Sequence, residues 1–147
     1  MTGVARWNDL APRLISAVVM LVVGGAALAL GGFWLRALLA LVCGAMIWEV
    51  ICLFAPHEGK RALRFAGATA MAFFGATWLP VSGAAFVMLA AVILIYKRLP
   101  VKGLLFPTYS ALVSAGAMGI SGLYIQSGLT PVIWLISLVI ITDLAGY

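Results

Sequence analysis

Charged residues are scarce in this chain, and acidic ones are the scarcest. Only 9% of the 147 residues are charged, with four Asp or Glu against nine Lys or Arg. Soluble domains use about 25% charged and about 45–50% apolar residues, whereas 65% of this chain is apolar. One soluble core could not enclose that much apolar surface. The composition therefore excludes an ordinary water-soluble domain and indicates that lipid surrounds most of the chain.

Histidine and cysteine are rare as well. His57 is the only histidine, so nothing resembles a zinc-ligand spacing. Cys43 and Cys52 share one apolar segment, about 13 Å apart along a helix at ~1.5 Å per residue, which is too far for a disulfide. We expect two buried, unreactive thiols. The sequence also contains no phosphate-cradling glycine loop with a lysine, no nucleophile elbow and no cluster of metal ligands.

Apolar segments make up most of the chain, and its mean hydropathy is +1.20. Spanning a bilayer takes about 20 residues, and lipid cannot satisfy free backbone amides, so each segment should be helical. We predict an all-α, polytopic membrane protein with about six transmembrane helices. The segments are Leu14–Gly31, Phe33–Ala55, Phe65–Leu79, Val81–Tyr96, Gly103–Ile125 and Leu129–Tyr147. The third and fourth are short; they are either spans extended by their flanks or one helical hairpin that turns at Leu79–Gly83.

Basic residues alternate from loop to loop. Arg36 lies on one side, and eight lie on the other: Arg6, Arg13, Lys60, Arg61, Arg64, Lys97, Arg98 and Lys102. Such asymmetry predicts that the N-terminus and both basic loops are cytoplasmic, and six spans then return the chain to that face at Tyr147. The net charge of +5 thus indicates topology, not nucleic-acid binding. The two basic loops should attract anionic headgroups at about 1 kcal/mol per charge; recruitment of substrate phosphate is the alternative.

Asp143 is the carboxylate with the strongest functional signal. At mid-membrane a carboxylate costs roughly 2.5–3.5 kcal/mol on insertion scales, so such groups are functional by default. Asp143 should lie about four or five residues, some ~6 Å, inside the cytoplasmic boundary, with Tyr147 one turn further on the same face. There it can meet water, a cation or a loop lysine. The alternative is an interfacial carboxylate that reaches toward water.

We predict a structural role for Glu49. It follows Trp48 near the cytoplasmic end of the second span, where Trp favours the membrane interface. We expect an anchor or an interhelical pair with Arg13, Lys60 or Arg64.

Small residues repeat at spacing four in the fifth segment, at Ala111, Ala115 and Gly119. Such a stripe lets helix backbones approach closely. We predict packing within the molecule, with a homo-oligomer interface as the alternative. Pro107 should be tolerated because its missing donor falls near the first turn of the helix.

Three short motifs together resemble the N-terminal portion of the bacterial phosphatidate cytidylyltransferase (CDP-diacylglycerol synthase) family. They are Arg13-Leu14-Ile15-Ser16-Ala17, Trp48-Glu49 and Thr142-Asp143-Leu144-Ala145-Gly146-Tyr147. The resemblance covers essentially the whole chain, but residues 65–125 match only in hydropathy. Leu144 and Ala145 depart from the family's Thr-Asp block. Lys97-Arg98 is not the family's later signature, since Leu94 stands where that signature has Ser.

The resemblance implies a CTP-dependent nucleotidyltransferase of phospholipid biosynthesis in the bacterial inner membrane. Its substrates are CTP and phosphatidate, its partners are membrane lipids and not nucleic acid, and its products are CDP-diacylglycerol and pyrophosphate. It implies Mg²⁺ as cofactor and Asp143 as a catalytic and metal-site carboxylate. Residues 1–64 would form an N-terminal helix pair, 65–128 the middle helices and 129–147 the start of the catalytic region. We expect an inactive fragment whose reading frame continues past Tyr147.

Two other classes remain open. One is a small six-span transporter with Asp143 and Glu49 as cation or proton sites, although no convincing internal repeat with paired broken helices is present. The other is a non-catalytic membrane scaffold packed through the Ala111, Ala115 and Gly119 stripe.

Overall fold

The computed structural model describes residues 4–99 and 103–146; within them the side chains of residues 4–14, 16–17 and 143–144 lie outside the description. The described part is all-helical and contains no strand. Six α-helices and one 3-10 helix follow one another: α1 (Val4–Leu30), α2 (Gly32–Phe54), η1 (Pro56–Glu58), α3 (Gly59–Ala76), α4 (Val81–Arg98), α5 (Leu105–Ser127) and α6 (Leu129–Ala145). The all-α prediction is confirmed.

Each predicted apolar segment is a helix, and the largest differences in bounds lie at basic flanks. α3 begins at Gly59 and α4 ends at Arg98, so both reach 18 residues. Lys and Arg are good helix formers, so the helix continues where hydropathy falls. Pro107 is the third residue of α5, near the helix start as predicted.

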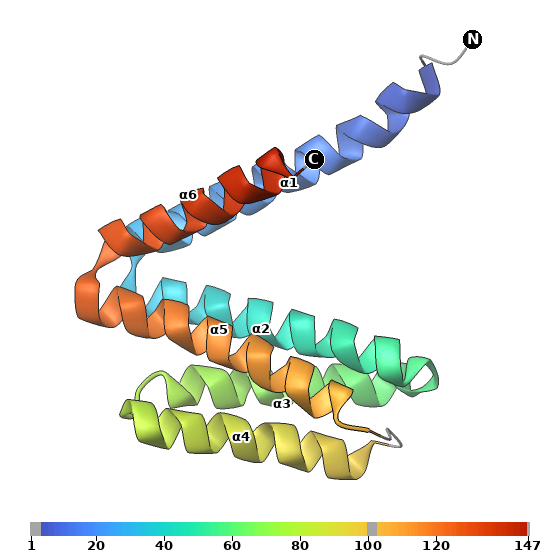
Figure 1. The fold of residues 1–147 in the computed structure, drawn as a ribbon, viewed down its shortest axis with the longest axis vertical. Helices are drawn as coiled ribbons and strands as arrows, with labels where there is room; N and C mark the ends of the chain where they lie inside the picture. The colour runs from blue at the N-terminus through green and yellow to red at the C-terminus, as the bar shows by residue number, and fades with distance from the viewer. Residues whose placement is uncertain (1–3, 100–102, 147) are drawn as a thin grey trace.

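Successive helices alternate in direction, which sorts the connections between the two ends of the bundle (Figure 1). The α2–α3 and α4–α5 connections lie at one end, on the right of the view. The α1–α2, α3–α4 and α5–α6 connections lie at the other. α6 starts at this second end and slants away from the bundle, and its C-terminal turn lies short of the first end.

α2 is central and packs most closely on α3. Gly44 makes this approach possible, because a Cβ added there would lie 2.9 Å from the Ala70 Cβ and 3.0 Å from the Ala66 carbonyl oxygen. Ile47 and Ile51 on α2 are fully buried beside this contact. Small side chains on both helices thus bring the two backbones together.

α5 packs on α2 in the antiparallel direction. Phe106 at the start of α5 meets Phe54 at the end of α2, edge to face with ring centroids 5.9 Å apart. At the other end, the backbone N–H of Gly32 donates a hydrogen bond to the Tyr124 hydroxyl, 3.3 Å away. Helix α4 completes the bundle by packing on α3 and α5.

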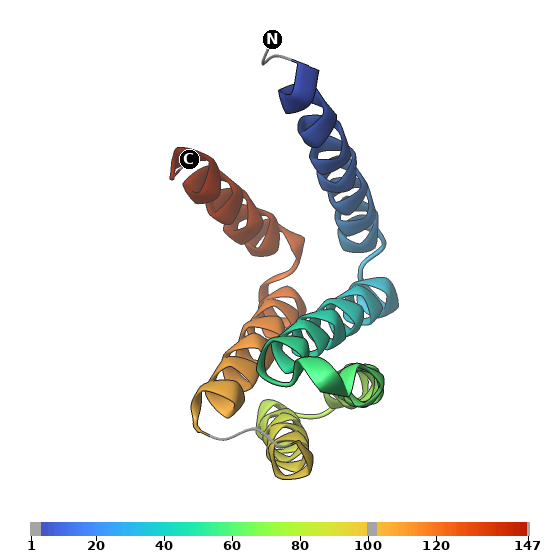
Figure 2. The same cartoon turned by 90° about the vertical axis from the view of Figure 1, so that its right-hand side faces the viewer.

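α1 and α6 form two arms that leave the bundle at glycine junctions. Gly31 and Gly32 have φ of 60° and 47°, and Gly128 has φ of 79°. These left-handed conformations favour glycine. α1 packs on α2, α6 packs on α5, and Figure 2 shows the two arms diverging from each other.

Two helices, α2 and α4, are long and apolar enough to cross a membrane. Only 33% and 22% of the residues in their most apolar stretches are buried inside the protein, so neither has the surroundings of a core helix in a soluble domain. Shorter apolar stretches lie in α1 and α6, at Val18–Leu30 and Leu129–Thr142.

Candidate functional site at the basic end

The basic residues of two loops gather at one end of the bundle because the helices alternate in direction (Figure 1). Lys60, Arg61 and Arg64 lie in the first two turns of α3, and Lys97 and Arg98 close α4. All five are exposed. Lys102 lies outside the described residues. This juxtaposition concentrates positive charge where α2 meets α3 and α4 approaches α5.

Most of this positive charge is not neutralised by protein carboxylates. The ion pair at this end joins the Arg61 guanidinium to the Glu58 carboxylate, N to O 3.0 Å, one turn apart on the surface. An exposed pair of this kind contributes about 0–1 kcal/mol. Within the described residues Lys60, Arg64 and Lys97 form no ion pair. Their charges are therefore available to phosphate groups.

Asp143 lies two residues before the end of α6, the helix that slants away from the bundle and ends short of its basic end (Figure 1). Its side chain is outside the described part, as is Tyr147, so the predicted shared face stays a prediction. The backbone puts residue 143 in the last turn of α6.

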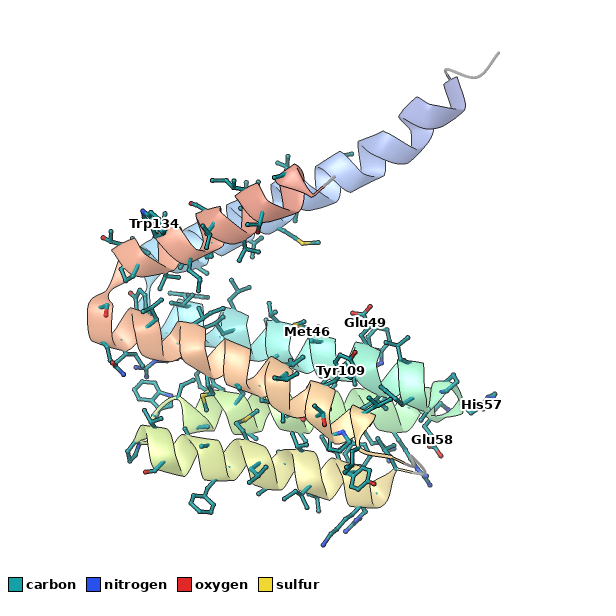
Figure 3. All side chains as sticks on the ribbon, viewed as in Figure 1. Met46, Glu49, His57, Glu58, Tyr109 and Trp134 are labelled. Carbon is teal, nitrogen blue, oxygen red and sulfur yellow. The ribbon has the colours of Figure 1, made fainter. Side chains whose placement is uncertain are left out.

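Glu49 is exposed on α2. Figure 3 shows its side chain pointing away from α3, toward the side of the bundle where the arms lie. Among the described side chains it pairs with neither Lys60 nor Arg64, and the Arg13 side chain lies outside them. The adjacent Trp48 is also exposed, which fits an interfacial anchor better than an interhelical ion pair.

The stripe of Ala111, Ala115 and Gly119 does not form the tight interface predicted from its spacing. Ala115 and Gly119 are exposed, and no atom lies within 4 Å of a Cβ added to Gly119. The three residues instead line a cavity of about 680 Å³ between α4 and α5. The buried stripe of this helix is the adjacent one, which contains Ser110, Ser114 and Ser121.

Both cysteines are free, as predicted; Cys43 is fully buried and Cys52 half-buried. Within the described residues, no three His, Cys, Asp or Glu side chains come together.

Two contacts at the end opposite the basic loops were not predicted from the sequence. The Arg36 guanidinium carbon lies 4.2 Å from the centroid of the Trp78 ring, a cation–π contact, and Tyr124 covers the Gly31–Gly32 junction. The sequence signal for the first was a lone arginine near the start of α2 and a Trp in the α3–α4 turn, which alternating helices bring to one end.

Comparisons with protein-family models, with curated proteins and with solved structures give no match. The functional conclusion therefore depends on the residues and their arrangement.

Proposed function

We propose that this chain crosses the bacterial inner membrane six times with a cytoplasmic N-terminus. We further propose that it forms the N-terminal part of a CTP-dependent phosphatidate cytidylyltransferase. The observation that carries the proposal is the gathering of both basic loops at one end of the bundle. Helix α6 starts from the opposite end and has Asp143 in its last turn. Among the described side chains, the basic one at the opposite end is Arg36.

The surface of the described residues supports a lipid environment. Large apolar side chains are exposed on every α-helix, including Met20 on α1, Phe86 on α4 and Trp134 on α6, each more than 70% exposed. Apolar patches on soluble monomers rarely exceed a few hundred Å². A bilayer would cover this surface, and two helices already meet the length and composition of a span.

The proposed reaction suits a site at the cytoplasmic boundary. CTP arrives from the cytosol, whereas the phosphatidate headgroup lies in the leaflet. A phosphate oxygen of phosphatidate attacks the α-phosphorus of CTP, and the bond from that phosphorus to the oxygen bridging the β-phosphate breaks. CDP-diacylglycerol forms and pyrophosphate leaves. Lys60, Arg64 and Lys97 would stabilise the phosphoryl charge and hold the headgroup.

Asp143 is the residue of this chain that we assign to Mg²⁺. When bound, Mg²⁺ neutralises charge on the reacting phosphates. Proteins often hold it through one or two carboxylates together with substrate phosphates and water. A single carboxylate therefore fits this donor set, although no group of three ligating side chains occurs in the described part.

The test compares two carboxylate variants in the full natural reading frame, expressed in membranes and supplied with radiolabelled CTP and phosphatidate. We expect Asp143→Asn to abolish CTP-dependent formation of CDP-diacylglycerol while the protein still reaches the membrane fraction. Glu49→Gln is the matched control, and it should retain activity because we assign Glu49 to anchoring. Full activity of Asp143→Asn would remove the residue from the site. No CTP-dependent product from the unaltered protein would favour the transporter or scaffold alternatives.

A further inference from the structure

A cavity of about 680 Å³ separates α4 from α5, at the end of the bundle opposite the basic loops. The α3–α4 turn bounds it at Thr77, and α4 lines it from Val81 to Val92. α5 lines the other side from Ala111 to Gln126. Its volume lies within the range of about 300–1,000 Å³ of ligand pockets, and it is partly open to the surface of the bundle.

The shape and lining of this cavity match a single hydrocarbon chain. Val81 and Val92 are eleven residues apart, which corresponds to about 16 Å at ~1.5 Å per residue. One leaflet supplies about half of a hydrocarbon core ~30 Å thick. Most lining side chains are Ala, Gly, Leu, Val or Met, and apolar cavities stay dry. In a bilayer, the medium at the opening is acyl chains and not water.

An amide side chain lines the outer end of the cavity, and a guanidinium lies at the same end of the bundle. Gln126 lines it and is exposed. Trp78, which follows the lining residue Thr77, holds the Arg36 guanidinium 4.2 Å from its ring centroid. Arg36 forms no ion pair with any described carboxylate. A cation therefore lies at the same end of the bundle as the outer end of the cavity, one residue from its lining through Trp78.

We propose that this cavity holds one acyl chain of a phospholipid from the non-cytoplasmic leaflet, with the phosphate beside Arg36. The site is at the end of the molecule opposite Asp143 and does not depend on the proposed reaction. It rests on the part of the proposed function that places the chain in a bilayer with a cytoplasmic N-terminus, because that orientation decides the leaflet.

The test uses the 147-residue protein in phospholipid nanodiscs that contain a lipid with a diazirine midway along one acyl chain. After irradiation, peptide mass spectrometry should find adducts concentrated on the lining residues of α4 and α5. Gly119→Leu fills the cavity, because a Cβ at Gly119 meets no atom within 4 Å, and it should reduce those adducts severalfold. Gly116→Leu is the matched control: Gly116 is exposed on the same helix, its Cβ position is equally free, and it does not line the cavity.

A separate experiment tests the position of the phosphate headgroup. Arg36→Gln should lower labelling by the phospholipid probe but leave labelling by a phosphate-free alkyl diazirine unchanged, which separates a lipid from a free hydrocarbon. Equal adducts in Gly119→Leu and the unaltered protein would overturn the proposal. So would adducts spread evenly over the exposed arms. Melting temperatures of both leucine variants establish that each is folded.

Discussion

Two separate constraints require glycine at Gly31, the junction between α1 and α2. Its φ of 60° and ψ of −160° are a backbone conformation that is almost restricted to glycine, and such a conformation costs other residues about 1–3 kcal/mol. A Cβ there would also overlap the Tyr124 hydroxyl, the group that accepts the hydrogen bond from the Gly32 N–H. Neighbouring Gly32 has φ of +47° but no atom within 4 Å of an added Cβ. Substitutions at these two positions therefore distinguish the effect of backbone strain from the effect of steric overlap.

We predict that Gly31→Ala lowers the melting temperature in detergent more than Gly32→Ala does. Gly32→Ala should lose only the backbone term of about 1–2 kcal/mol, whereas Gly31→Ala must also displace Tyr124. Adding Tyr124→Phe to Gly31→Ala should recover part of the difference, because it removes the overlapping oxygen. Equal melting temperatures for the two alanine variants would show that Tyr124 does not lie against Gly31.

Gly44 sets the separation of α2 and α3. An alanine there would bring its Cβ to 2.9 Å from the Ala70 Cβ and 3.0 Å from the Ala66 carbonyl oxygen, so one backbone must move. We predict that Gly44→Ala destabilises the protein by about 1–3 kcal/mol, the range for overpacking. Gly67→Ala on α3 should instead raise stability by at most about 1 kcal/mol, since its Cβ meets nothing. Denaturant titration followed by tryptophan fluorescence measures both, and loss of stability in both variants would contradict this assignment.

At the scale of elements, hydropathy predicts that the helices exist but not how their faces are used. All six predicted segments are helical, as expected for apolar runs that must satisfy their backbone hydrogen bonds internally. The bounds of α3 were missed because Lys60, Arg61 and Arg64 are polar yet helix-compatible. The face of α5 was missed for another reason. A stripe such as Ala111, Ala115 and Gly119 packs tightly only if the opposite helix fills the space, and α4 leaves a cavity there.

The predicted crossing of the membrane by α3 and α4 can be tested from the accessibility of their two ends. Their turn lies at the Arg36 end of the bundle, and the basic start of α3 lies at the other end. In a protein without Cys43 and Cys52, we predict that Ser82→Cys reacts with a membrane-impermeant maleimide added to intact cells. Lys60→Cys should react only after the cells are lysed. Labelling of both positions from the same side would exclude a helical hairpin that crosses the membrane.

At the scale of the molecule, the sequence could predict which groups gather at the basic end but not which side chains touch. Alternating helix directions and the positions of Lys60 and Lys97 at one end follow from counting helices. The position of Asp143 relative to them does not, because α6 slants away from the bundle. The contact between Arg36 and Trp78 does not, because it joins residues 42 positions apart and depends on how α2 and α3 rotate about their axes. Rotation is decided by close contacts such as Gly44 on Ala66, which hydropathy does not report.

The two arms should move more than the bundle does. α1 is joined through Gly31 and Gly32 and packs on α2, while α6 is joined through Gly128 and packs on α5. Spin labels on exposed positions of the arms, Val22→Cys and Ile141→Cys without the native cysteines, should give a broad distance distribution by pulsed electron resonance in nanodiscs. A pair within the bundle, Leu41→Cys on α2 and Leu112→Cys on α5, should give a narrow one, because these helices share the buried core around Phe106. A narrow distribution between the arms would mean that they are held at a fixed separation and that the glycine junctions do not act as hinges.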